Sequence, residues 1–312
     1  GGSTQFDSQK HLGTSTVYGQ QVNIMHGEAY TKTNFIVGEK TSLILLNSAF
    51  AQQQETYFGV KKYVGKQFNL TSALYIDHYY GAGNNNIKFG LSHRHNKLRE
   101  DIVFLQPLPF LDYQGTYFTN YDIPGLFAEN KLTFSKFTIL TGLRADRFDH
   151  FGWKFTPRIL VRANLSQDTD IRLNAGKGYR WAHIFSENTN LLAGNRSLVL
   201  ASDLAPEEAV NLGLNFIQTL HWNEINITLS GDAYLTYFQN QIFPDYDAEI
   251  NTAIVRNFFG KSISKSYQLE NKWIFSQQFD LKVAYNYLQV YREIEGIKQD
   301  LPFIPKHKWT AN

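Results

Sequence analysis

The fold is decided by the stretch INITLSGDAYLTY at residues 225–237. Apolar or small side chains at positions 225, 227, 229, 231, 233 and 235 alternate with polar or aromatic ones at the positions between them. A period of two places each set on its own face of a β-strand. The stretch therefore predicts a strand with one apolar and one polar face, longer than the roughly 5–6 residues usual in soluble sheets.

The same alternation recurs along the whole chain, and helical periodicity is almost absent. Further strands are predicted near residues 22–37, 41–58, 66–80, 86–104, 121–134, 139–147, 155–166, 171–176, 210–216, 251–275 and 280–295. Apolar runs of about 18 residues, which would predict a transmembrane helix, do not occur. The predicted fold class is therefore all-β and antiparallel.

Alternation alone does not separate a soluble sandwich from a membrane barrel, because either can leave one sheet face polar. The connections favour the barrel. Tight turns are predicted at residues 38–40, 135–136, 167–168, 222–223 and 277–278, and long loops at 105–120, 182–206 and 243–252. Short turns on one rim and long loops on the other are typical of bacterial outer-membrane barrels. With about 25 residues for each strand and its share of the connections, the chain predicts about 12 strands.

The composition is compatible with this fold. Of the 312 residues, 43% are hydrophobic and 15% aromatic, which suits aromatic girdles at two membrane interfaces. A formal net charge of +2 gives no indication of a nucleic-acid partner. The absence of cysteine excludes disulfides and thiolate metal sites.

Six ordered segments resemble the barrel domain of TonB-dependent outer-membrane receptors, in the form found in Bacteroidota. They are PGLFAEN (124–130), TGLRAD (141–146), FTPR (155–158), IRLNAGKGYR (171–180), FSEN (185–188) and DLAPEEAVNLG (203–213). Asn257, Gly260 and YQLE (267–270) also stand where that family places them. The resemblance is strong over the central part of the chain and weaker on both flanks.

The resemblance implies a barrel of about 22 strands closed by a plug domain, in the bacterial outer membrane. Residues 1–312 are then expected to be a partial transmembrane barrel, with the plug and the C-terminal strands not present. The implied role is TonB-driven uptake of a scarce nutrient complex, such as a ferric siderophore, haem or cobalamin. A passive channel or porin, and a barrel partner of a surface lipoprotein, are the alternatives.

The implied partners are the lipid bilayer, a small-molecule or metal-chelate ligand, and the TonB–ExbB–ExbD system acting through the plug. No nucleic acid, cofactor or covalent chemistry is expected. Catalytic motifs such as a P-loop, HExxH or GxSxG do not occur. His93 and His95 share a strand face, but no acidic partner is fixed by spacing, so no metal site is predicted.

Two loops are the candidate ligand-facing surface, because loops on a rigid wall commonly carry recognition. Aromatic loop residues could equally anchor the barrel at the membrane interface. The candidate residues are Trp181, His183, Asn188, Asn190, Asn195 and Arg196 at the first loop, and Tyr113 and Tyr117 at the second.

Four charged residues, Arg144, Asp146, Arg172 and Arg180, fall on the polar faces of neighbouring strands. One interpretation is a lumenal charge ladder that contacts a plug or guides an anionic ligand. The other is cross-strand ion pairing that keeps the wall ordered. The sequence alone leaves both open.

Overall fold

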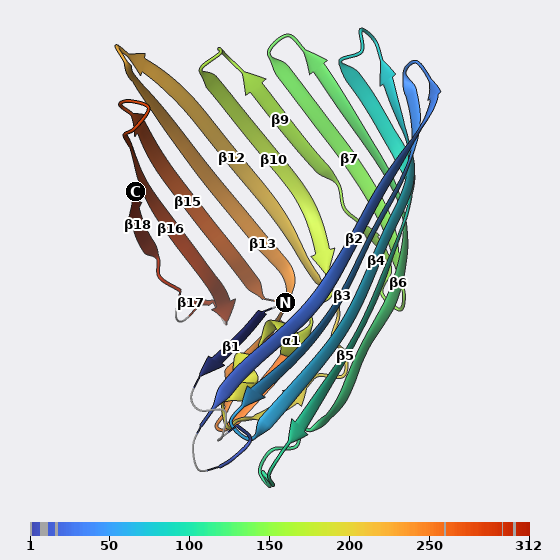
Figure 1. Cartoon of the computed structure of the whole chain (residues 1–312), viewed down its shortest axis with the longest axis vertical. Coiled ribbons are helices and arrows are strands. Elements are labelled where there is room, and N and C mark those ends of the chain that lie inside the picture. Colours follow the sequence, from blue (N-terminus) through green and yellow to red (C-terminus); the bar gives the residue numbers. More distant parts are fainter. Residues whose placement is uncertain (1, 7–11, 16–17, 259, 295, 302–303) are drawn as a thin grey trace.

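The computed structural model describes residues 2–6, 12–15, 18–258, 260–294, 296–301 and 304–312, and it is one long, curved β-sheet (Figure 1). Its strands are β1 (Gly2–Phe6), β2 (Gln20–Gly38), β3 (Thr41–Phe58), β4 (Lys61–Tyr80), β5 (Asn85–Phe104), β6 (Gly115–Phe134), β7 (Phe137–Phe148), β8 (Gly152–Phe155), β9 (Arg158–Asn164), β10 (Thr169–Arg180), β11 (Ser197–Leu200), β12 (Glu207–Trp222), β13 (Ile225–Glu249), β14 (Thr252–Phe258), β15 (Lys261–Ile274), β16 (Asp280–Ile294), β17 (Ile297–Asp300) and β18 (His307–Ala311). Two one-turn helices, α1 (Ile184–Glu187) and α2 (Asn190–Ala193), lie between β10 and β11.

The long strands pair antiparallel, each with the next one along the chain. They are β2 to β7, β9, β10, β12, β13, β15 and β16, which agrees with the expectation of about 12 strands. Short strands complete the sheet at its ends, and β11 pairs parallel with β14. The all-β, antiparallel prediction is confirmed.

The apolar side chains of these strands lie on the outside of the sheet. Leu212 and Leu235 face each other across β12 and β13 and are 53% and 42% exposed. Leu143 on β7 and Leu269 on β15 are 53% and 64% exposed. In a soluble sandwich this face would be packed into a core, so its exposure identifies lipid as its solvent.

The predicted tight turns are confirmed, and they gather on one rim of the sheet, the upper one in Figure 1. Ser135 and Asn223 take the left-handed conformation these turns need, at φ 49° and 53°. Aromatic rings cluster beside two of the turns, Phe134 with Phe137 and the pair at residues 275 and 279. The other rim carries the longer connections, although residues 59–60 join β3 to β4 and residues 250–251 join β13 to β14 on that side.

Three sequence-based boundaries were wrong. β6 begins at Gly115, so the loop predicted at 105–120 ends at residue 114, six residues earlier than predicted. The loop predicted at 243–252 lies mostly within β13, which extends beyond the membrane wall and pairs there with β14. The strand predicted at 251–275 is two strands, because β14 belongs to this loop-side extension and β15 to the wall.

The buried core of the protein sits at the loop rim. It joins the ends of β3, β4 and β5 to the α1–α2 connection and to the β11–β14 pair. Phe185, Leu192 and Val255 are each 1% exposed there. Among the described residues, no helix is long and apolar enough to cross a membrane.

Candidate functional site

Asp146 is the centre of a hydrogen-bonded cluster on the inner, polar face of the wall. Its carboxylate is fully buried and accepts two bonds of 2.8 Å from Arg144 Nε. Arg94 and Tyr179 each donate to Asp146 Oδ2 at 2.8 Å. Arg144 also donates to Ser92 Oγ at 2.8 Å. One carboxylate therefore ties together β5, β7 and the loop-side end of β10.

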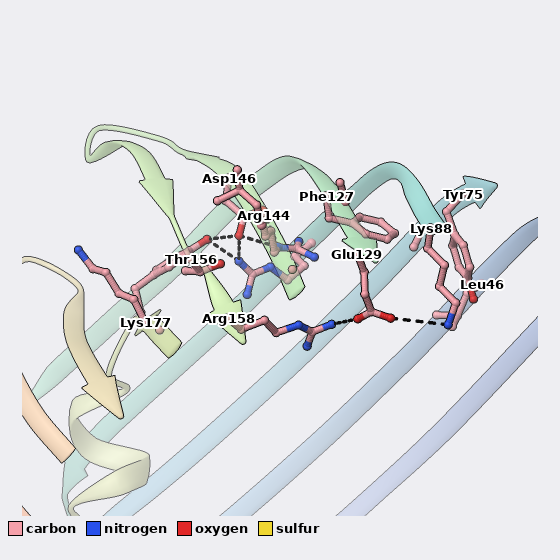
Figure 2. A pocket seen from close by; sticks show the side chains of 17 residues that line it. Leu46, Tyr75, Lys88, Phe127, Glu129, Arg144, Asp146, Thr156, Arg158 and Lys177 are labelled. Carbon is pink, nitrogen blue, oxygen red and sulfur yellow. Dashed lines mark hydrogen bonds and ion pairs between the residues drawn. The ribbon is translucent and has the colours of Figure 1, made fainter. Parts of the chain in front are cut away.

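The cluster forms one side of a hollow of about 560 Å³ on the inner face (Figure 2). On the opposite side, Glu129 lies between Arg158 and Lys88, whose Nζ is 3.7 Å from a Glu129 oxygen. Alternation explains the placement: Glu129 on β6, Lys88 on β5 and Arg158 on β9 all lie on the polar face of the ladder.

Cations outnumber carboxylates around this hollow. Five cationic side chains line it, at positions 88, 94, 144, 158 and 177, against the two carboxylates of Glu129 and Asp146. The buried Arg94 Nε has no hydrogen-bond partner within the described part of the chain. Such a lining attracts anions, since fixed charges of one sign in a cleft raise the local concentration of the opposite charge.

The four residues of the predicted charge ladder do not form one ladder. Arg144 and Asp146 are bonded to each other, as above. Arg172 instead donates to Asp170 at 2.7 Å, near the short-turn rim. Arg180 donates to Glu207 at 2.6 Å and to Glu187 at 2.7 Å, at the loop rim. Each arginine has a carboxylate beside it, the arrangement expected of ion pairs that order the wall.

The connection between β10 and β12 folds back onto the inner face rather than extending into solvent. Phe185 of α1 packs against the Tyr117 ring, with 4.7 Å between centroids. Leu191 and Leu192 of α2 join the same core. β11 then adds to β14, with Ser197 opposite Thr252. The principal candidate ligand loop is therefore a packed structure with one exposed side.

Of the six candidates in this loop, Asn190, Asn195 and Arg196 lie on its exposed side. Arg196 donates to the Tyr246 carbonyl at 2.6 Å and stands over the Tyr246 ring, and Asn190 donates to the Tyr246 hydroxyl at 3.2 Å. Tyr246, on the extension of β13, therefore fixes both side chains, which sequence analysis did not anticipate.

The other three candidates of this loop hold it together. The Trp181 ring packs at a tilt against Phe151, with 5.5 Å between the ring centroids. Asn188 donates to the Ile184 carbonyl at 3.0 Å and so closes the turn of α1. His183 is half-buried, and its Nδ1 has no hydrogen-bond partner among the described residues. Burial lowers the pKa of His183, with Glu187 opposing that shift and Arg180 adding to it.

The two tyrosines of the second candidate loop differ from expectation. Tyr113 is 2% exposed, its ring packs in the loop core, and burial raises the pKa of its phenol. Tyr117 is not in a loop but in β6, and its hydroxyl donates to the Tyr113 carbonyl at 2.8 Å. Both therefore contact the folded loop rather than open solvent.

Two buried charged residues that attach the loop to the wall were missed. Glu100 is 4% exposed and accepts bonds from the Tyr63 hydroxyl at 2.9 Å and the Ser186 N–H at 3.0 Å. Lys61 is 3% exposed and donates to the carbonyls of Leu192 and Gly194. Glu100 had a signal in the sequence: it shares its strand face with residues 98 and 102, both apolar.

His93 and His95 lie on the outward face of β5, and both contact Asp122 of β6 at 3.0 Å. The acidic partner that sequence spacing did not supply thus comes from the neighbouring strand, through the β5–β6 register. Within the described ranges, no group of three or more His, Cys, Asp or Glu side chains is arranged to hold a metal ion.

Comparison with known proteins gives a family and a fold. Residues 2–312 match the family model described as TonB dependent receptor-like, beta-barrel. No curated protein matches the sequence. Among solved structures, the ferric-catecholate import receptor Fiu of Escherichia coli K12 is similar at a TM-score of 0.63 and 11% identity, over 95% of this chain and 52% of that chain.

Two further solved structures show the same likeness. For the alcaligin outer-membrane receptor FauA of Bordetella pertussis, the TM-score is 0.59 at 11% identity, over 94% of this chain and 50% of that one. For the siderophore receptor PiuA of Acinetobacter baumannii, it is 0.57 at 12% identity, over 94% and 52%. At such identities the likeness shows the fold alone, and the chain spans about half the length of these structures.

Proposed function

Because the chain belongs to the TonB-dependent receptor-like β-barrel family of the bacterial outer membrane, we propose that it forms part of a transporter wall for a scarce nutrient complex. The transporter would be energised by TonB–ExbB–ExbD through a plug domain inside the complete barrel. The barrel would perform no covalent chemistry. Its own contribution would be to hold the loops and to line the path.

The observation that carries the proposal is the cationic hollow on the inner face beside Asp146. A passing ligand would meet Lys88, Arg94 and Arg158 there, and these charges favour an anionic complex over a neutral one. Ferric chelates with carboxylate or catecholate groups are anionic. The similar structures include a ferric-catecholate import receptor, an alcaligin receptor and a siderophore receptor, which supports a ferric siderophore ahead of haem or cobalamin.

Uptake by cells that carry or lack the full gene tests the proposal. Iron-starved cells would receive iron-labelled siderophores, haem or labelled cobalamin, each with and without a functional TonB. We expect saturable uptake of at least one anionic ferric siderophore that is lost when either the gene or TonB is removed. Immunoblotting of outer membranes would confirm equal receptor levels.

Other outcomes would favour the alternatives. Uptake that persists without TonB and rises linearly with concentration would indicate a passive channel. Copurification of the barrel with a surface lipoprotein in mild detergent, together with uptake that requires that lipoprotein, would indicate a barrel subunit. Indifference to all three classes of nutrient would overturn the cargo assignment but leave the barrel fold intact.

A further inference from the structure

A hollow of about 470 Å³ opens on the opposite, outward face of the sheet, across β3 to β8. Its apolar wall is a row of leucines paired across four strands: Leu45, Leu74, Leu91 and Leu126. In the next row toward the loop rim, Ser72 and Pro124 are too short to fill the space between their neighbours. The hollow therefore follows from small side chains standing beside large ones on the lipid-facing surface.

The hollow straddles the border at which the outward face changes from apolar to polar. On β5, Phe89 and Leu91 are outward and apolar, and the next outward residues toward the loop rim are His93, His95 and Lys97. Short turns occupy the far rim, which in outer-membrane barrels is periplasmic. The polar border beside the hollow accordingly lies at the outer leaflet of the membrane.

The loop-rim side of the hollow carries an uncompensated positive charge. Arg147 of β7 lines it, is exposed, and makes no ion pair or hydrogen bond with the described residues. The nearby carboxylate of Asp122 is already engaged by both His93 and His95. Trp153, which stands opposite Arg147 in the β7–β8 ladder, is 52% exposed.

We propose that this hollow binds a phosphorylated, acylated lipid of the outer leaflet. An acyl chain would lie against the leucine row, and Arg147 would hold a headgroup phosphate at the polar border. Arginine suits phosphate because its planar guanidinium donates two parallel hydrogen bonds. Tryptophan favours the headgroup level, where its ring is apolar and its N–H finds polar partners. The lipid would then be a fixed part of the wall between β3 and β8.

The test is lipid retention by the full-length receptor, purified from outer membranes and exchanged into detergent with defined lipids. Diphosphorylated lipid A is the probe, and its dephosphorylated form is the matched control lipid. Native mass spectrometry would count lipids bound to the wild type, Arg147→Ala and Ser72→Leu. Lys265→Ala is the control variant, because Lys265 is an outward cation on β15, remote from the hollow.

We expect Arg147→Ala to lower the affinity for phosphorylated lipid about fivefold, the effect of one cation at a membrane surface, and to leave the dephosphorylated lipid unchanged. Ser72→Leu fills the apolar part and should weaken both lipids, whereas Lys265→Ala should weaken neither. Arg147→Lys should keep part of the phosphate preference. Electrophoretic heat-modifiability would confirm that each variant is folded.

Three results would overturn the proposal. Equal retention by the wild type, Arg147→Ala and Ser72→Leu would mean that the hollow holds no lipid. An equal loss in Lys265→Ala would mean that phosphorylated lipid binds through general surface charge and not at this site. Protection of Trp153 from chemical modification in intact membranes, but not in purified receptor loaded with lipid A, would mean that a protein partner occupies the hollow instead of a lipid.

Discussion

Gly125 faces Asp146 in the β6–β7 ladder, and a Cβ added to Gly125 would lie 2.0 Å from Asp146 Oδ1. The carboxylate has no room to move, because Arg144, Arg94 and Tyr179 hold it in place. The glycine is therefore part of the Asp146 cluster, although it contributes no side chain to it.

Gly125→Ala should lower the free energy of unfolding by about 1–3 kcal/mol, the usual cost of an overpacked site. Gly27→Ala is the matched control, because nothing lies within 4 Å of a Cβ at that position on β2. Urea unfolding of the purified barrel, followed by tryptophan fluorescence, would measure both. If the two variants unfold at the same urea concentration, the close packing around Asp146 is not as described.

Asp146→Ala should lower the free energy of unfolding more than Tyr179→Phe does. Removing the carboxylate leaves Arg94 and Arg144 without their shared anion. This should lower the free energy of unfolding by about 2 kcal/mol, which is less than for a fully buried pair because the two guanidiniums are about a third exposed. Losing the Tyr179 hydroxyl removes one bond to a charged group, worth about 1.5 kcal/mol or less. The double variant should lower the free energy of unfolding by less than the sum of the two single effects, because Arg94, Arg144 and Tyr179 all bond to the one carboxylate.

Glu100→Ala should release the α1–α2 connection from the wall. The Tyr63 hydroxyl and the Ser186 N–H would lose their acceptor, at a cost of about 2 kcal/mol. Proteolysis of the 181–206 segment should then be roughly tenfold faster or more, while the rest of the barrel stays resistant. Asp101→Asn, on the outward face of the same strand, is the control and should change nothing. Unchanged proteolysis in Glu100→Ala would contradict the attachment.

The same segment should loosen in mild acid because of His183. Burial lowers the folded-state pKa of this histidine, so below its ordinary value of 6.5 the unfolded segment binds a proton that the folded one does not. Stability is therefore complete above that pH and falls as the pH drops through it. Proteolysis should accelerate between about pH 7.5 and about pH 5.5 in the wild type, but not in His183→Gln. If proteolysis accelerates equally in the wild type and in His183→Gln, a group other than His183 causes the acid response.

Arg158→Gln should slow uptake of an anionic ligand about fivefold at low salt, and the difference should shrink as salt screens the charge. Arg172→Gln is the control, since Arg172 lies on the same face but near the short-turn rim, outside the cationic hollow. The initial rate of labelled uptake at two salt concentrations would measure both. If the two variants take up the ligand at equal rates, the cationic hollow does not lie on the transport path.

The wall of this protein could be predicted from the sequence because strand alternation is a local property. The strand at 41–58 and the turn at 135–136 appear where the pattern placed them, and the turn predicted at 222–223 lies one residue later, at 223–224. The loop region could not be predicted in the same way. Whether residues 243–249 continue a strand depends on β14, which in turn pairs with β11, and no local pattern states that partnership.

In the Asp146 cluster and the loops, likewise, some contacts could be predicted from the sequence and others could not. Alternation correctly put Arg144 beside Asp146, but Arg94 and Tyr179 reach that carboxylate from strands 52 and 33 residues away. Tyr113 looked like an exposed loop aromatic, but it is buried in one core with Phe185 of α1 and Leu198 of β11, which are remote from it in sequence. Contacts set by strand register were predictable, and contacts set by loop packing were not.

Nearly every pairing in the described wall joins a strand to the one before or after it in the chain. Each new hairpin thus closes only a short loop, so its entropic cost is small and independent of how much wall already exists. Lys61 and Glu100, in contrast, join residues 131 and 86 positions away. Assembly should accordingly proceed hairpin by hairpin, with amides of the 181–206 segment gaining protection from hydrogen exchange last.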